Sequence, residues 1–119
     1  MGGFMMDVDK LKAAGVDYED GLARFSNNAQ IYEKYLRKLV DQNQYTEMKD
    51  AIDAGDVEAA FQAAHKLKAF MGNLSITELY HNVAEVTEIF RAGSFDGSQP
   101  YVEQMDRQME EIIQAITEE

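Results

Sequence analysis

At 119 residues the chain is long enough for one domain with a single core, and its apolar runs are far shorter than the ~20 residues that span a bilayer. Its 22 acidic and 11 basic side chains give a formal net charge of −11, which disfavours nucleic acid and anionic membrane surfaces as partners. The absence of cysteine excludes a disulfide framework and a thiolate metal site, and a single proline leaves room for long helices.

The first residues read as an extension of the domain rather than as a targeting segment. Residues 1–6 lack the basic start and the longer apolar stretch of a signal peptide. We expect residues 1–13 either to pack on the domain or to be partly disordered, and residues 14–119 to form the domain itself. Together with the missing cysteines, this indicates a cytoplasmic protein.

Helix-boundary signals predict three segments in the first half of the domain. A short helix starts near Asp17 and runs through Arg24, and a second runs from about Ala29 to Asn43 behind the capping residue Asn28. A third covers Tyr45 to Ala54. The apolar positions of the second segment recur at three- and four-residue spacing, which predicts one buried stripe. They are Ile31, Tyr35, Leu36, Leu39 and Val40.

The next helix is predicted over Val57 to Leu74, because Gly55 and Asp56 end one helix and cap the following one. Its apolar positions form a near-heptad stripe, so this helix should pack lengthwise in a bundle. They are Val57, Ala60, Phe61, Ala64, Leu67, Met71 and Leu74.

Two further helices complete the predicted fold. Ser75 and Glu78 have the spacing of a capping box, which predicts a helix that begins at Ser75 and ends before Gly93. Pro100 suits the first turn of a final helix. Long amphipathic helices with short loops predict an all-α protein: an antiparallel four-helix bundle with additional short N-terminal helices. Such a closed bundle gives no reason to expect more than a monomer.

His65 is the residue that stands out on this pattern. It falls at the edge of the buried stripe, and the positions one and two turns later are Ala69 and Gly72, which leave the imidazole on a locally flat surface. Gly72 costs a helix roughly 1 kcal/mol against alanine, which indicates a close approach or the end of the helix. Lys68 is poorly placed for a histidine that is to be protonated, but it suits one that carries a phosphoryl dianion.

The chemistry of imidazole fits that interpretation, because a neutral nucleophilic nitrogen is available near pH 7. Attack on a phosphoryl group requires mainly positioning and charge stabilisation. Its position on the helix alone, however, favours an ordinary histidine at the boundary of the core.

The stretch from Ala64 to Ser75 resembles the signature of the histidine-containing phosphotransfer (HPt) domain, in which His-x-Leu-Lys-Gly precedes Leu-Gly by some five residues. The segments 15–17, 21–25, 55–56 and 91–93 also resemble that family, so the likeness covers roughly residues 14–118. Two positions depart from it: Ala69 and Ser75 stand where the family usually has glycine. Neither departure removes the histidine or the lysine.

The resemblance implies a role for each matching residue. His65 would be the phosphoacceptor, and Lys68 would stabilise the charge of the phosphohistidine. Around them we expect a docking surface for the partner, with candidates on the same helix: Phe61, Gln62, Ala69, Phe70 and Gly72.

The implied partners are the receiver domain of a response regulator, a hybrid histidine kinase, or both. The protein would be an intermediate in a multistep phosphorelay, with no cofactor of its own and with Mg²⁺ supplied by the receiver. It has neither a phosphate-binding glycine loop nor a Walker lysine, so it would be a phosphocarrier without kinase activity of its own. The main alternative is a helical interaction module of the same fold that is never phosphorylated.

A metal site is a more distant alternative. Glu78 and His81 form a Glu-x-x-His pattern, followed by Glu85 and Glu88, which is half of a di-iron carboxylate site. The only other histidine is His65, which has Gln62 at the matching offset. His81 is therefore better explained as a surface residue, and we expect no metal.

Overall fold

The computed structural model describes residues 6–117, which contain seven α-helices and no strand. They are α1 (Val8–Ala13), α2 (Tyr18–Arg24), α3 (Ala29–Asp41), α4 (Gln44–Ala54), α5 (Val57–Asn73), α6 (Thr77–Arg91) and α7 (Gln99–Thr117). The predicted all-α class is confirmed. Within the described part of the chain, no helix has both the length and the apolar character that crossing a membrane requires.

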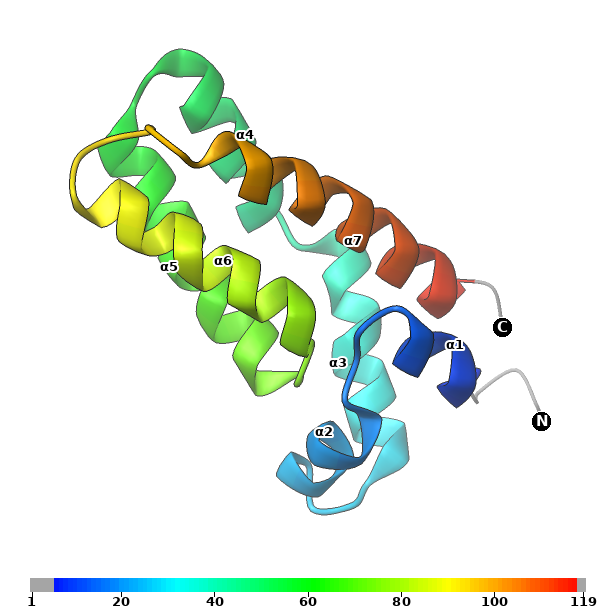
Figure 1. Ribbon diagram of the computed structural model, residues 1–119. Helices are drawn as coiled ribbons and strands as arrows, with labels where there is room; N and C mark the ends of the chain where they lie inside the picture. The colour runs from blue at the N-terminus through cyan, green and yellow to red at the C-terminus, as the bar shows by residue number, and fades with distance from the viewer. Residues whose placement is uncertain (1–5, 118–119) are drawn as a thin grey trace.

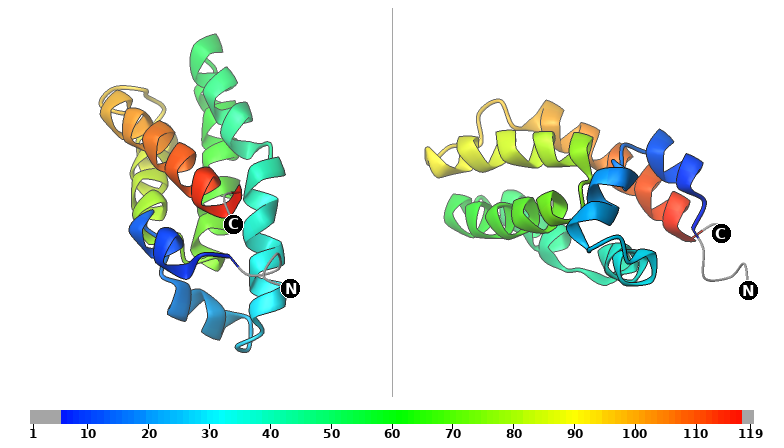
Figure 2. Two further views of the ribbon diagram at one scale, coloured as in Figure 1. Left: turned by 90° about the vertical axis from the view of Figure 1, so that its right-hand side faces the viewer. Right: turned by 90° about the horizontal axis from the view of Figure 1, so that it is seen from below.

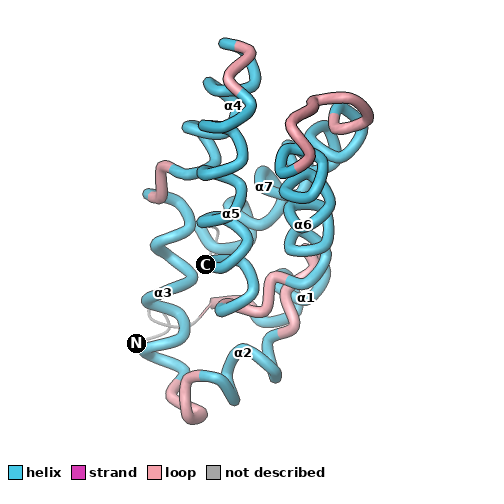
Figure 3. The backbone as a smooth tube through the Cα atoms, turned by 90° about the vertical axis from the view of Figure 1, so that its left-hand side faces the viewer, coloured by secondary structure: helices cyan, strands magenta, loops and turns pink. Residues whose placement is uncertain are grey.

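The helices form an elongated antiparallel bundle that measures 47 × 25 × 20 Å (Figure 1). α5 packs against α4 and α6, while α7 packs against α6 and, more loosely, against α3. Figure 3 shows that α3 and α4 follow one another end to end, so together they make the first rod of the bundle. The predicted four-helix bundle is confirmed, with its first rod divided in two and the short helices α1 and α2 before it.

The division between α3 and α4 comes from Gln42, whose backbone is extended at φ −70° and ψ 149°. Helix α3 therefore ends at Asp41, slightly before the predicted end at Asn43. Helix α4 begins at Gln44 and ends at Ala54, close to its predicted bounds.

The predicted stripe on α3 is partly wrong. Leu36 and Leu39 are buried, but Ile31, Tyr35 and Val40 are 44%, 38% and 41% exposed. Tyr32 and Glu33 face the core in their place.

Polar partners explain this rotation of α3. The Glu33 carboxylate accepts hydrogen bonds from the Met6 backbone N–H at 3.0 Å and from the Tyr18 hydroxyl at 2.8 Å. The Tyr32 hydroxyl donates to the Leu74 carbonyl at 2.7 Å. A pattern of apolar residues cannot reveal a buried face whose contacts are polar.

Helix α5 is delimited as predicted. Gly55 takes the left-handed conformation at φ 72°, which favours glycine, and ends α4. The Asp56 carboxylate then accepts the Ala59 backbone N–H at 3.1 Å and caps α5. The buried face of α5 matches much of the predicted stripe and consists of Ala60, Ala63, Ala64, Leu67 and Met71.

The predicted capping box of Ser75 and Glu78 is wrong. Helix α6 begins at Thr77, its N-cap is Ile76, and no side chain caps it. A capping residue needs extended backbone, whereas Ser75 is left-handed at φ 58°. Its hydroxyl instead donates to Oδ2 of Asp20 at 2.5 Å.

The N-terminal helices close one end of the bundle beside the turn between α5 and α6 (Figure 2). The Asp17 N–H donates to the Ser75 carbonyl at 2.9 Å, and the Thr77 N–H donates to the Gly15 carbonyl at 3.1 Å. Helix α1 packs against α7 and α2, and its Leu11 is fully buried. The segment before α2 is thus bonded directly to the turn that follows α5.

Candidate functional site

His65 lies on the exposed side of α5, near the middle of the helix. Its imidazole stacks on the ring of Phe61 one turn earlier, with the centroids 5.8 Å apart and the planes at 28°. The guanidinium carbon of Arg91, from the last turn of α6, lies 4.8 Å from the centroid of the same Phe61 ring. An aromatic ring that itself contacts a cation therefore adjoins the imidazole from its N-terminal side.

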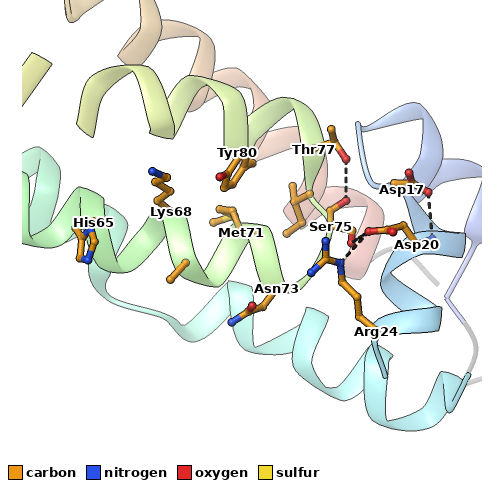
Figure 4. Close-up of a pocket in the computed structure, with 13 residues that line it drawn as sticks. Asp17, Asp20, Arg24, His65, Lys68, Met71, Asn73, Ser75, Thr77 and Tyr80 are labelled. Carbon is orange, nitrogen blue, oxygen red and sulfur yellow. Dashed lines mark hydrogen bonds and ion pairs between the residues drawn. The ribbon is translucent and has the colours of Figure 1, made fainter. Parts of the chain in front are cut away.

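Lys68 follows His65 by one turn and is half-buried. Its ammonium makes no hydrogen bond or ion pair with any residue in the described part of the chain. Both side chains line one groove of about 650 Å³, shown in Figure 4. The ammonium is thus a charge without a committed partner beside an exposed imidazole.

Two small residues of α5, Ala69 and Gly72, follow His65 along this groove. Ala69 is exposed, and Gly72 is covered by the ring of Tyr80 from α6. A methyl group on Gly72 would come 3.2 Å from Cε1 of Tyr80, which is tighter than ordinary contact. Gly72 therefore lies where α5 and α6 approach each other closely. Close approach was one of the two explanations that the sequence offered for this glycine, the other being the end of the helix.

The far end of the groove is built by α2 and by the turn between α5 and α6. Oδ2 of Asp20 accepts hydrogen bonds from the Ser75 hydroxyl and from Nε of Arg24, the latter at 2.9 Å. The Ser75 hydroxyl and then the Arg24 guanidinium lower the pKa of the Asp20 carboxyl below its ordinary value. Asp17 lines the same end and accepts the Asp20 backbone N–H at 3.2 Å.

The residues predicted for the site do not all share this groove. His65, Lys68, Ala69 and Gly72 do. Gln62 lines a separate groove between α4 and α5, where its amide donates to Glu58 at 3.1 Å. Phe70 lines another, together with Phe25, Tyr35 and Lys38 of the N-terminal half. Phe61 adjoins the site through its ring contacts with His65 and Arg91.

Sequence reasoning gave no role to Arg24 or Arg91, although both lie in segments that resemble the family. The pattern along the chain does not connect either residue with His65, because they come from α2 and α6. Only the packing of these helices around α5 brings their guanidinium groups to the edges of the site.

His81 belongs to the Glu-x-x-His pattern of the alternative metal site. Its ring contacts Tyr80, with the centroids 5.9 Å apart. Among the described residues, no group of three or more histidine, aspartate or glutamate side chains is arranged to hold a metal ion.

Comparison with known protein families matches this chain to a family model. The family model of the Hpt domain matches residues 30–116. Neither the search of curated proteins nor that of solved structures finds a match. The matched range runs from α3 to α7 and includes both His65 and Lys68, whereas α1 and α2 precede it.

Proposed function

The chain belongs to the Hpt domain family, whose members are histidine phosphotransfer modules of phosphorelays. From this premise we propose that His65 accepts a phosphoryl group from the aspartate of a receiver domain and passes it on. The donor and acceptor are receiver domains of response regulators or of hybrid histidine kinases.

The observation that carries this proposal is the pairing of an exposed imidazole with an uncommitted ammonium. His65 and Lys68 line the same groove, and Lys68 has no partner among the described residues. The other histidine, His81, has glutamates at positions 78 and 85, one turn to either side, which would repel a phosphoryl group. Charge therefore favours His65 as the acceptor.

The transfer is a direct displacement at phosphorus. The lone pair of His65 Nε2 forms the P–N bond while the P–O bond of the aspartyl phosphate breaks. The aspartate leaves as a carboxylate with the electron pair of that bond, and the reverse step regenerates the aspartyl phosphate. The receiver brings Mg²⁺ and most of the groups that stabilise the loose transition state. Lys68 offsets charge on the phosphohistidine.

The surface around His65 suits a docking partner. The exposed Ala69 lets the backbone of a receiver approach α5 closely, Gly72 adds no side chain of its own beneath the Tyr80 ring, and Phe61 supplies apolar surface beside the imidazole. Gln62 and Phe70 flank this area and line the neighbouring grooves. We assign these five residues to the receiver docking surface.

The decisive experiment compares the wild type with His65→Gln and with the matched control His81→Gln. Each protein is mixed with phosphorylated receiver domains of the source organism, and its intact mass is measured before and after acid treatment. We expect an acid-labile gain of one phosphoryl group in the wild type and in His81→Gln, but not in His65→Gln.

Two outcomes contradict the proposal. A gain that persists in His65→Gln assigns the acceptor to another residue. Receiver binding without phosphoryl transfer to any of the three proteins favours the interaction module that is never phosphorylated.

A further inference from the structure

Arg24 is fixed at one end of its guanidinium group. Its Nε donates to Oδ2 of Asp20 at 2.9 Å, and the same oxygen accepts the Ser75 hydroxyl at 2.5 Å. Asp20 is thereby held from two elements, its own helix α2 and the turn after α5 (Figure 4). The guanidinium is positioned by this chain of contacts rather than left to rotate freely.

The other end of the guanidinium is uncommitted. Neither terminal nitrogen of Arg24 has a partner among the described residues, and the side chain is 53% exposed. Arg24 lines both the groove of His65 and the neighbouring groove of Phe70, so it forms the ridge between them. A fork of two N–H donors is the geometry that binds a carboxylate through two parallel hydrogen bonds.

The carboxylates at this end of the groove leave the terminal nitrogens of Arg24 available to a partner protein. The carboxylates that face it are Asp20, which is bonded to Ser75 and to Nε, and Asp17, which accepts the first-turn N–H of α2. Lys68 lies further along the groove and is also unpaired among the described residues. In a chain of net charge −11, this groove therefore presents two cations with free donors.

We propose that Arg24 is a specificity-determining contact, which binds an aspartate or glutamate on the receiver domain docked over His65. This inference rests on the proposed phosphotransfer function. His65 fixes the position of the reacting aspartate, and the groove leads from it along α5 to Asn73, which lines the groove together with Arg24. Eight helical residues span roughly 12 Å at 1.5 Å per residue. The partner carboxylate therefore lies away from the reacting aspartate in the direction of the C-terminal end of α5.

Ser75 is a positioning residue in this arrangement. Its left-handed backbone at φ 58° favours glycine, the residue that the family usually has there. Serine at this position supplies the hydroxyl that holds Asp20, and through it the guanidinium. The departure from the family pattern is thus explained by a contact that glycine cannot make.

The test compares Arg24→Glu with Arg107→Glu, which makes the same change of charge on an exposed residue of α7 outside both grooves. The readout is kcat/KM for transfer from phosphorylated receiver domains of the source organism. We expect Arg24→Glu to lower it at least about tenfold with its cognate receiver, more strongly at low salt, and Arg107→Glu to have little effect. Arg24→Lys should retain part of the rate, because it keeps the charge but loses the fork.

A second donor separates docking from folding and from chemistry. Phosphoramidate transfers its phosphoryl group to imidazole with loss of ammonia and needs no protein interface. We expect Arg24→Glu to react with it as the wild type does. Exchange of the matching receiver carboxylate for lysine should restore transfer to Arg24→Glu.

The outcomes distinguish this inference from the proposed function. If Arg24→Glu and Arg107→Glu accept phosphoryl groups equally well from every receiver, the docking role of Arg24 is overturned while the role of His65 stands. If Arg24→Glu also loses its reaction with phosphoramidate, its slow transfer is not a docking effect and the proposal is overturned. If Arg24→Lys transfers at the full wild-type rate, the contact requires the charge but not the two-donor fork. A wild type that accepts no phosphoryl group from any receiver overturns both proposals.

Discussion

The surface next to His65 is accessible because the exposed side chain one turn later, that of Ala69, is only a methyl group. Ala69 is exposed one turn after the histidine, so replacing it with leucine adds bulk where we propose that the receiver backbone approaches. We expect Ala69→Leu to slow transfer about tenfold or more, since overpacking a contact costs about 1–3 kcal/mol. The free energy of unfolding should change little, because the added side chain projects into solvent.

The chain offers a matched control for this prediction. Ala59 is also exposed on α5 but lines the separate groove between α4 and α5. Ala59→Leu should transfer at the wild-type rate when kcat/KM for transfer from phosphorylated receiver domains is measured for both variants. Equal rates for both variants would remove the argument that small residues are needed for docking.

The ring of Phe61 contacts both the imidazole of His65 and the guanidinium of Arg91. Stacked aromatic pairs contribute about 0.5–1.5 kcal/mol beyond their buried area, enough to favour one orientation of the imidazole. Arg91 is held by Glu88 at 3.2 Å and lies over the Phe61 ring. These contacts limit how the His65 ring can turn before it meets its partner.

At the scale of the elements, one hydroxyl joins α3 to the turn that follows α5. Tyr32 is fully buried, and its hydroxyl donates to the Leu74 carbonyl at 2.7 Å. Tyr32→Phe would leave that carbonyl buried without its partner. We expect the free energy of unfolding to fall by about 1–3 kcal/mol, measured by urea denaturation.

Tyr101→Phe is the control for this loss of a hydroxyl. Tyr101 is half-buried, and its hydroxyl has no hydrogen-bond partner among the described residues. Its replacement should change the free energy of unfolding by no more than about 0.5 kcal/mol. A similar loss in the two variants would show that the Leu74 contact contributes nothing specific.

The hydrogen bond between Tyr32 and Leu74 also explains why residue 21 is a glycine. A methyl group there would overlap the ring of Tyr32, which is held in place by its bond to Leu74. Helix α2 can approach α3 only because residue 21 is glycine. The sequence resemblance included this glycine, but its physical reason lies in a tyrosine from the next helix.

How far the sequence predicts each element depends on where its determinants lie. Helix α5 was predictable in its bounds and in much of its buried face, because Gly55, Asp56 and the apolar stripe are all local. The buried face of α3 could not be predicted, because Tyr32 and Glu33 are buried through polar contacts with distant segments. Local patterns record burial in an apolar core, not burial through a hydrogen bond.

The same distinction holds for the candidate site. His65, Lys68, Ala69 and Gly72 could be grouped from helical spacing alone, and the structure places all four along one groove. Ser75 was misread as a cap, because its preference for capping is a local property and its bond to Asp20 is a tertiary one. The packing of separate helices, which spacing does not reveal, positions Arg24.

On the scale of the whole molecule, the groove of His65 is assembled from two parts of the chain. Its central portion comes from α5 and α6, inside the range that matches the Hpt family. Its far end comes from α2, which precedes that range. Helix α2 therefore lines the groove as well as supporting the fold, and under the docking role that we propose for Arg24, partner preference can vary there without a change in the histidine helix.

These N-terminal contacts also predict how stability depends on pH. Burial, followed by the hydrogen bond to Glu33, raises the pKa of Tyr18 to about 12. In the unfolded chain a tyrosine ionises near pH 10, so between about pH 10 and pH 12 only the unfolded state loses this proton. The contribution of Tyr18 is fully present below pH 10 and is lost as the pH rises through the folded value.

The check is urea denaturation of the wild type and of Tyr18→Phe between about pH 9 and pH 12. We expect the free energy of unfolding to fall more steeply with pH in the wild type than in the variant. Tyr32, whose pKa is raised by burial and next by the charge of Tyr18, also contributes in both proteins, but less in the variant, which adds to the steeper fall in the wild type. Parallel curves would show that Tyr18 ionises alike in the folded and unfolded states.

The paired backbone bonds between residues 15–17 and 75–77 have one more consequence. The N–H of Asp17 and the N–H of Thr77 each donate to the opposite segment, so neither amide is released unless the two segments separate. Their deuterium uptake should accordingly proceed at one common rate, set by a single opening event. Two stretches that lie far apart in the chain would then behave as one cooperative unit, and the wall of the groove would open and close as a whole.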